Sequence, residues 1–302
     1  MKKIVIAAGT GFLGQVLINY FKGKTDEIVV LTRGQSAYKN GVKYVNWNAT
    51  TFTGWESELE NADVLINLAG KSVDCRYNDA NKKAILESRT GSTSVLNLAV
   101  KMCQNPPKHW LNSSTATIYR HSTDKQMDET TGEIGDDFSM NVAQAWEKTF
   151  FEIDTPHTLK TALRTSIVLG KKGGAFLPLK NLIQMGFGGK QGNGRQFVSW
   201  IHELDFARAV EFVIEKQITG LINIVSPQPI SNAEFMKKLR KALQVPVGLA
   251  ISTKMLEFGA KIIGTETELV LKSRNVIPKR LLENGFVFTF GQAETAFKDL
   301  AQ

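Results

Sequence analysis

The sequence has little cysteine and little histidine, which excludes several classes of site. Its 302 residues include two cysteines, Cys75 and Cys103, and four histidines. Two isolated cysteines make neither a metal-binding spacing nor a disulfide framework, so a reducing cytosolic setting fits best. The histidines have no metal-ligand spacing, and neither a metal site nor a hydrolase triad finds support. They are His109, His121, His157 and His202.

The sequence also lacks long apolar runs. No segment approaches the roughly 20 apolar residues that a membrane-spanning helix needs. The short apolar run at the N-terminus leads directly into a glycine-rich turn, so we expect no signal peptide and a cytoplasmic protein. The net charge of +8 comes with lysines that are scattered along the chain rather than clustered. We therefore expect no nucleic acid and no membrane as partners, and an anionic ligand such as a phosphate-bearing cofactor suits the charge better.

What the sequence does have is a glycine-rich turn close to its start. The apolar residues 4–6 predict a buried strand, the small residues 7–11 a turn, and Phe12 the beginning of a helix. In this order, a Gly-x-Gly-x-x-Gly pattern indicates dinucleotide binding, because backbone amides and the helix N-terminus hold the pyrophosphate. The residues predicted to bind the cofactor here are Gly9, Thr10, Gly11, Phe12, Leu13 and Gly14. An ordinary strand–helix turn that is rich in glycine is the alternative.

The next predicted strand covers residues 27–32, and the residues at its end indicate whether the cofactor is NAD(H) or NADP(H). A fold that binds NAD(H) places an acidic residue there, on the ribose 2′-hydroxyl. This chain has Thr32 and then Arg33. A hydroxyl beside a guanidinium accepts a 2′-phosphate that an acidic group would repel. We therefore expect NADP(H) rather than NAD(H), with a plain surface role for Arg33 as the alternative.

Strands and helices alternate along the first part of the chain. Strands are predicted at 43–46, 63–68, 110–113 and 159–164, and helices at 12–22, 79–103 and 138–154. This alternation predicts parallel βαβ units in an α/β protein with a Rossmann-type doubly wound parallel sheet.

The pattern changes after residue 170, where glycine-rich loops weaken the alternation. Helices are predicted at 203–216 and 231–243, a strand at 221–225, and short helices after residue 252. We expect a dinucleotide-binding domain over 1–170, to which parts of 203–225 return. A smaller α+β domain over 171–302 should close over the ligand at the carboxyl ends of the strands.

Several segments resemble the short-chain dehydrogenase/reductase superfamily of the extended type. They are DVLINLAGKSVDCR (63–76), ILESRTGST (85–93), LRTSIVLGKKGGAF (163–176), GFGGKQGNGRQFVSWIHELD (186–205), NIVSPQPISNAEF (223–235) and PKRLLENGFVF (278–288). Within the superfamily they are similar to the atypical branch labelled epimerase family protein, which is NAD-dependent epimerase/dehydratase-like and has a C-terminal domain of unknown function. The resemblance implies a Rossmann-type domain, a nicotinamide cofactor and a small-molecule substrate. Extended members often pair through helices equivalent to 79–103 and 138–154, so a homodimer is one expected assembly.

The glycine turn departs from the superfamily at one place. The usual pattern is Thr-Gly-x-x-Gly-x-x-Gly, and this chain has Ala7 and Ala8 in place of the first Thr-Gly. Gly11 and Gly14 fill the later glycine positions. We expect that alanine makes this turn only with a negative φ, because its Cβ disfavours the left-handed region.

The catalytic dyad of the superfamily, a Tyr and a Lys four residues apart on one helix, is absent. Its positions fall near Ser139 and Ala143. Thr115 stands where the superfamily has the Ser or Thr that polarises the substrate oxygen. Tyr119 and His202 are the predicted substitutes, since proton transfer needs a group within hydrogen-bond reach of the substrate. A half-buried aromatic role for Tyr119 and a helix-capping role for His202 are the alternatives.

Further site residues follow from the resemblance. The strand end formed by Leu68, Ala69 and Gly70 should back the adenosine or diphosphate side of the cofactor. Arg89 on the long helix and Arg164 at a strand end are expected beside the cofactor. The predicted substrate-binding residues are Arg195, Gln196 and Trp200, with a core position for Trp200 as the alternative.

Two hypotheses about function remain open. The first is an NADP(H)-dependent oxidoreductase or epimerase-like enzyme that acts on an unidentified small molecule. The second is a non-catalytic NADP(H)-binding sensor or regulatory protein, which the missing dyad favours. The dense polar and aromatic set at 186–202 favours the enzyme.

Overall fold

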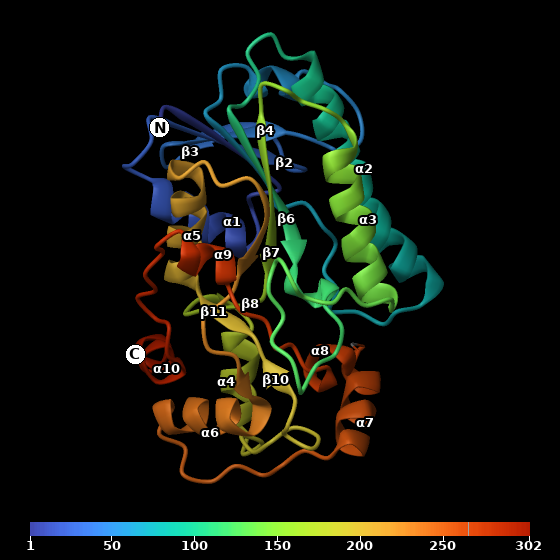
Figure 1. Ribbon diagram of the computed structural model, residues 1–302, viewed down its shortest axis with the longest axis vertical. Helices are drawn as coiled ribbons and strands as arrows, with labels where there is room; N and C mark the ends of the chain where they lie inside the picture. Colours follow the sequence, from blue (N-terminus) through green and yellow to red (C-terminus); the bar gives the residue numbers. More distant parts are fainter. Residues whose placement is uncertain (265) are drawn as a thin grey trace.

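The computed structural model describes residues 1–264 and 266–302, and an eight-stranded sheet lies at its centre (Figure 1). The strands lie in the order β12-β7-β6-β5-β1-β2-β4-β3. All neighbours are parallel except β3 and β4. The strands are β1 Lys3–Ala7, β2 Glu27–Thr32, β3 Ala37–Lys39, β4 Val42–Asn46, β5 Val64–Asn67, β6 His109–Thr115, β7 Leu159–Thr165 and β12 Gly220–Ile224. This order is that of a Rossmann-type doubly wound sheet, which confirms the predicted fold class.

Helices cover both faces of this sheet. On one face α1 packs against α5, and on the other α2 packs against α3. These helices are α1 Phe12–Phe21, α2 Asp79–Met102, α3 Phe138–Glu152 and α5 Glu203–Glu215. Because both faces are covered, the central strand β1 is apolar on both sides, with Ile4 and Ile6 in one core and Val5 in the other.

The hairpin of β3 and β4 is a feature that the apolar pattern of the sequence does not predict. The strand predicted at 43–46 is present as β4, but the three residues of β3 carry no apolar pattern. The turn between them is made by Asn40 and Gly41, which both have positive φ, at 51° and 77°. Tyr38 on β3 is 75% exposed. Strand β3 is the edge of the sheet, and so short an edge strand offers little backbone for pairing with another chain.

A smaller C-terminal part builds a core of its own below the sheet in Figure 1, from α4, α6 and α10. Its elements are β8 Ile167–Gly170, β9 Gly173–Gly174, α4 Phe176–Gln184, β10 Phe197–Val198, β11 Trp200–His202, β13 Ile230–Ser231, α6 Asn232–Ala242, α7 Thr253–Ile263, α8 Glu268–Leu271 and α10 Ala293–Ala301. Helix α9 Lys279–Glu283 packs instead against β12, with Leu281 in the core of the large sheet. Phe176, Trp200, Phe235 and Phe297 lie at the centre of this core. Short 3-10 turns at Trp55–Leu59 and Ala116–Ile118 complete the elements of the described residues.

The two parts alternate along the chain. After β9 and α4 the chain returns with α5, which covers the sheet beside α1, and β12, which extends the sheet beside β7. After β12 the chain continues into the C-terminal part with β13 and α6. The domain division at residue 170, with parts of 203–225 returning to the first domain, stays a prediction. Among the helices of the described residues, none is long and apolar enough to span a membrane.

Candidate functional site

The turn after β1 contains a strained alanine. Ala8 has a φ of +58°, in the left-handed region, and its amide donates to the carbonyl of Leu31 over 2.9 Å. The expectation of a negative φ at Ala8 is therefore wrong. The turn keeps the geometry that glycine would have and holds it through the hydrogen bond to β2, at a cost of about 1–2 kcal/mol for the left-handed alanine.

The three glycines of the turn have different surroundings. A Cβ at Gly14 would lie 2.1 Å from the carbonyl oxygen of Gly9, so Gly14 lets α1 approach the turn closely. A Cβ at Gly9 would meet the side chain of Ile6 at 2.9 Å. A Cβ at Gly11 would meet nothing within 4 Å. Packing therefore requires Gly9 and Gly14, whereas Gly11 keeps open a space beside the helix N-terminus.

The N-terminus of α1 opens on this space. Gly11 is the N-cap residue, and no described side chain accepts a hydrogen bond from the amides of the first turn. Unpaired amides and the positive end of the helix dipole bind phosphate groups. The turn therefore fits the pyrophosphate of a dinucleotide.

A cavity of about 360 Å³ lies where β5, β6 and β7 end. Five of the residues predicted to bind the cofactor line it, namely Leu13, Leu68, Ala69, Gly70 and Arg89. The turn at 68–70 is fixed by Asn67, whose carboxamide oxygen accepts from the amide of Ala69 over 3.0 Å. The carboxyl ends of the strands are where doubly wound folds bind their ligands.

Arg89 brings a positive charge to this cavity. Its guanidinium donates to the carbonyls of Lys71 and Ile85, over 3.1 and 2.9 Å, and lies 5.2 Å from the ring of Trp146. It forms no ion pair with a carboxylate in the part of the chain that the structure describes. Burial lowers the pKa of Arg89, which means that the charged form lacks a full counter-charge. An anionic ligand in the cavity would supply one.

The positions of the absent dyad also face this cavity. Ser139 and Ala143, on successive turns of α3, both line it. Thr115 lines it from the end of β6, and its hydroxyl oxygen accepts from the amide of Thr117 over 3.1 Å. The hydroxyl hydrogen of Thr115 is therefore free to donate to a ligand.

Tyr77 is a cavity residue that the sequence interpretation missed. It lies on the loop between β5 and α2, and its ring packs edge-on against Phe138 with 5.0 Å between centroids. Within the described residues its hydroxyl has no hydrogen-bond partner. Burial, with a smaller contribution from the carboxylate of Glu268, raises the pKa of Tyr77 to about 12, so the hydroxyl keeps its proton at neutral pH. The usable signal was its place after a strand end, where loops of this fold meet ligands.

Tyr119 and Arg164, in contrast, lie outside the cavity in a buried polar network. Arg164 donates to both carboxylate oxygens of Glu147 over 2.8 Å and to the hydroxyl of Tyr119 over 2.9 Å. Tyr119 in turn donates to Asn223 over 3.0 Å, and Ser114 donates to Glu147 over 2.6 Å. Burial raises the pKa of Tyr119. Both side chains make their hydrogen bonds inside the protein and do not line the cavity, so the structure gives no support to a catalytic role for Tyr119 or a cofactor role for Arg164.

His202 is a helix-capping residue. Its Nδ1 accepts from the amide of Leu204 over 3.1 Å at the start of α5, and its Nε2 faces Asp299 at 3.2 Å. The ring packs on Phe290 with 4.0 Å between centroids. Burial lowers the pKa of His202, against the opposing charge of Asp299. The structure supports the capping alternative, and a catalytic role for His202 stays an untested prediction.

The three predicted substrate residues do not line the cavity. Trp200 is fully buried and packs on Phe297. Gln196 is buried too, and its amide donates to the carbonyl of Gln191 over 2.8 Å. Arg195 is exposed on the loop before β10. Trp200 and Gln196 therefore stabilise the C-terminal part, as the core alternative for Trp200 predicts.

Thr32 and Arg33 lie at the carboxyl end of β2, beyond the glycine turn. The hydroxyl of Thr32 accepts from the amide of Gly34 over 3.2 Å, and Arg33 is exposed. In the part of the chain that the structure covers, the guanidinium of Arg33 has no ion-pair partner. It is free to bind an anion beside the turn. Among the described residues there is also no group of three His, Cys, Asp or Glu side chains that could hold a metal ion.

Comparison with known proteins gives consistent matches along the chain. The NAD dependent epimerase/dehydratase family matches residues 4–140, and a domain of unknown function, DUF1731, matches residues 255–300. Epimerase family protein YfhF of Bacillus subtilis (strain 168) is 31% identical over 302 residues, covering 98% of this chain and 97% of the relative. Epimerase family protein SDR39U1 of Mus musculus is 29% identical over 303 residues, covering 99% of each.

Two solved structures extend this similarity to the fold. The crystal structure of human epimerase family protein SDR39U1 (isoform 2) with NADPH has a TM-score of 0.86 at 26% identity, covering 99% of both chains. A nucleoside-diphosphate sugar epimerase from Corynebacterium glutamicum has a TM-score of 0.79 at 26% identity. It covers 99% of this chain and 58% of that one.

Proposed function

Because the chain belongs to the epimerase family proteins of the NAD-dependent epimerase/dehydratase family, we propose that it binds NADP(H) and works as an oxidoreductase or epimerase-like enzyme on a small molecule. The observation that carries this proposal is the cavity at the ends of β5, β6 and β7, which adjoins a glycine turn suited to a pyrophosphate. The human relative with a similar fold was solved with NADPH, which supports the choice of cofactor.

Arg33 is proposed to distinguish NADPH from NADH. Its free guanidinium at the end of β2 suits a 2′-phosphate, and charged hydrogen bonds contribute about 2 kcal/mol. We expect NADPH to bind more tightly than NADH, and Arg33→Ala to weaken NADPH binding about 30-fold while NADH binding stays unchanged. Fluorescence titration with each dinucleotide measures both affinities. Lys39→Ala, on the neighbouring hairpin, is the matched control, and equal affinities for NADPH and NADH in the wild-type protein would refute the assignment.

The proposed chemistry uses the hydroxyls of the cavity. A bound nicotinamide would supply a hydride to a carbonyl carbon, and the carbonyl oxygen must then gain a proton. Thr115 would donate a hydrogen bond to that oxygen, and Tyr77 would give it the proton from Oη, leaving an alcohol and a phenolate that water reprotonates. Because burial raises the pKa of Tyr77 to about 12, its hydroxyl is protonated at neutral pH and can serve only as the proton donor.

Replacing Tyr77 tests this role. Tyr77→Phe keeps the packing on Phe138 and removes the proton, so we expect turnover to fall about 100-fold with NADPH affinity unchanged. The measurement follows NADPH absorbance with a panel of carbonyl compounds and sugar nucleotides, which include the substrate class named for the Corynebacterium structure. Tyr38→Phe, at an exposed position on β3, is the control. Wild-type turnover in Tyr77→Phe would remove this tyrosine from the mechanism.

The second candidate function is a sensor or regulatory protein that binds NADP(H) without turnover. The observation that favours it is the pair Ser139 and Ala143, which line the cavity where a reductase carries its Tyr and Lys. Tight NADPH binding by the wild-type protein, without absorbance loss on any compound of the panel, would favour this function over the enzyme.

A further inference from the structure

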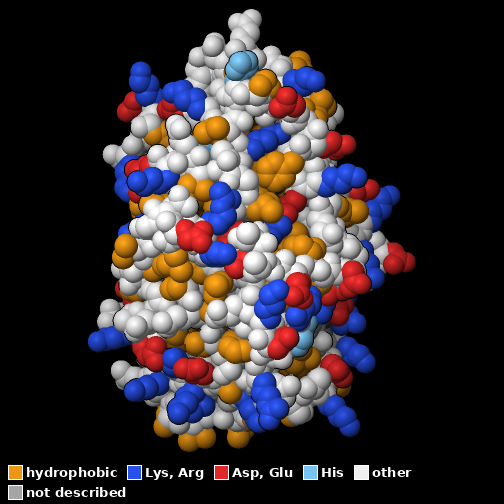
Figure 2. Space-filling view, in the orientation of Figure 1, with side chains coloured by type: hydrophobic (Ala, Val, Ile, Leu, Met, Phe, Trp, Pro, Cys, Tyr) orange, Lys and Arg blue, Asp and Glu red, His pale blue; other side chains and the backbone are white. Residues whose placement is uncertain are grey.

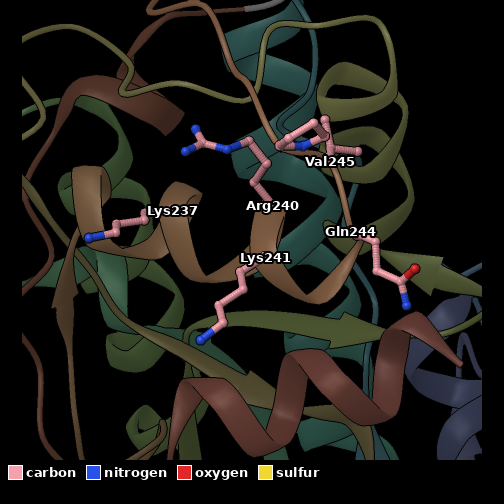
Figure 3. Close-up of a pocket in the computed structure, with 6 residues that line it drawn as sticks. Lys237, Arg240, Lys241, Gln244 and Val245 are labelled. Carbon is pink, nitrogen blue, oxygen red and sulfur yellow. The ribbon is translucent and has the colours of Figure 1, made fainter.

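A second hollow lies far along the chain from the candidate site, at the carboxyl end of α6. It has a volume of about 380 Å³ and is lined by Lys237, Arg240, Lys241, Gln244, Val245 and Pro246 (Figure 3). Lys237, Arg240 and Lys241 are three and four residues apart, so they share one face of the helix. None of these three cations forms an ion pair with a carboxylate in the described chain. Like charges at this spacing destabilise a helix slightly, so an anion in the hollow would relieve them.

Exposed apolar side chains lie near this hollow. Val247 and Leu249 follow it directly in the chain and are 70% and 61% exposed, and Met185 is 66% exposed. Leu249 is held beside the end of α4, because its amide donates to Gly186 over 2.8 Å and its carbonyl accepts from Gly189 over 3.0 Å. Gly248, between Val247 and Leu249, lies next to the guanidinium of Arg240, because a Cβ there would be 2.8 Å from Nη1.

The basic and apolar groups therefore share one end of the molecule. Figure 2 shows Lys and Arg side chains close to apolar side chains at the lower end, where Figure 1 places α6 and the loop that follows it. Large apolar side chains that stay exposed beside cations indicate an interaction surface rather than a solvated face. Helix α6 thus presents Lys237, Arg240 and Lys241 at the same end of the molecule as the 245–250 loop.

We propose that this end of the protein docks on the surface of an anionic lipid bilayer. Lipid phosphates would bind in the hollow of α6, and the side chains of Val247, Leu249 and Met185 would enter the boundary between headgroups and acyl chains. A free phosphate would occupy the hollow without using the aliphatic rim. Nucleic acids are held by basic grooves with aromatic side chains that stack on bases, whereas these three side chains are aliphatic. No residue that lines the candidate cavity takes part, so the proposal is independent of the proposed function.

Co-sedimentation of the full chain with phosphatidylcholine vesicles, with and without phosphatidylserine, tests this docking. We expect binding to the anionic vesicles alone, with a steep loss at high salt. The double variant Lys237→Gln/Lys241→Gln should bind about 30-fold more weakly, roughly fivefold for each lysine. Arg240 is left intact because it also donates to the carbonyl of Gly188 over 3.0 Å. Val247→Ser and Leu249→Ser should each weaken binding about tenfold.

The matched control is Lys39→Gln/Lys101→Gln, which removes the same charge from exposed positions on β3 and α2. It should bind vesicles like the wild type, and all variants should keep the wild-type melting temperature because the changed side chains are exposed. Equal binding to neutral vesicles, no binding to either kind, or unchanged binding by the lysine pair would overturn the proposal. A dimer that Val247→Ser and Leu249→Ser dissociate would assign the face to a second copy instead. Tighter binding to a labelled DNA oligonucleotide than to vesicles would assign it to nucleic acid.

Discussion

Gly11→Ala is expected to abolish tight dinucleotide binding and to leave the free energy of unfolding within about 1 kcal/mol of the wild type. Gly11 has a φ of −76°, which alanine adopts without strain, and its Cβ would meet no protein atom within 4 Å. That same Cβ would occupy the space in which a pyrophosphate must approach the amides of α1. We expect a loss in NADPH affinity of about 100-fold, or ~3 kcal/mol.

Gly14→Ala is the matched variant, and its main effect should be on stability rather than on NADPH affinity. Its Cβ would lie 2.1 Å from the Gly9 carbonyl, so α1 must move away from the turn. We expect a loss of at least about 3 kcal/mol in the free energy of unfolding. Chemical denaturation and NADPH titration on both variants separate the two roles. Wild-type NADPH affinity in Gly11→Ala would show that this turn does not hold the phosphates.

Glu147→Gln is expected to destabilise the protein by about 3–5 kcal/mol, because it leaves the guanidinium of Arg164 buried without a counter-charge. The side chains of Arg164 and Glu147 are 5% and 11% exposed. Although burial disfavours the charged guanidinium, the hydrogen bonds to Glu147 outweigh this and raise the pKa of Arg164. The carboxylate of Glu147 also accepts a hydrogen bond from Ser114. The substitution would therefore also disturb the end of β6, which lies beside the cavity.

Urea denaturation at neutral pH measures this effect. Glu152→Gln, at an exposed position on the same helix, is the control and should change stability by less than about 0.5 kcal/mol. The double variant Glu147→Gln/Arg164→Leu should recover part of the loss, since no charge then remains buried. A loss below about 1 kcal/mol in Glu147→Gln would mean that water reaches Arg164 and that the network is not a buried ion pair.

The sequence predicts the dinucleotide half of the candidate site from local signals. The glycine turn, the strand ends and Arg89 lie within or directly after elements that the apolar pattern identifies. Ala8 is the exception within this half. Its positive φ depends on the hydrogen bond to Leu31, which belongs to another strand.

The catalytic half could not be predicted in the same way, because side-chain direction and loop convergence decide it. Arg164 and Thr165 are neighbours on β7 and point to opposite faces, so Thr165 lines the cavity and Arg164 lies in the buried network. Tyr77 reaches the cavity from a loop that has no periodic pattern. The sequence favours a substrate site at 186–202, yet Trp200 of this segment packs in the C-terminal core.

The interleaving of the two parts has a consequence for how the chain is made. Strand β12 pairs with β7 but is separated from it by α4 and its surrounding loops. A growing polypeptide therefore cannot complete the sheet until residue 224 has emerged from the ribosome, and until then β7 presents an open edge. Cutting the gene at residue 170 would release a fragment that lacks both its last strand and the α5 cover of one face. The two parts build separate cores but alternate along the chain, so we expect them to be made and to fold as one unit.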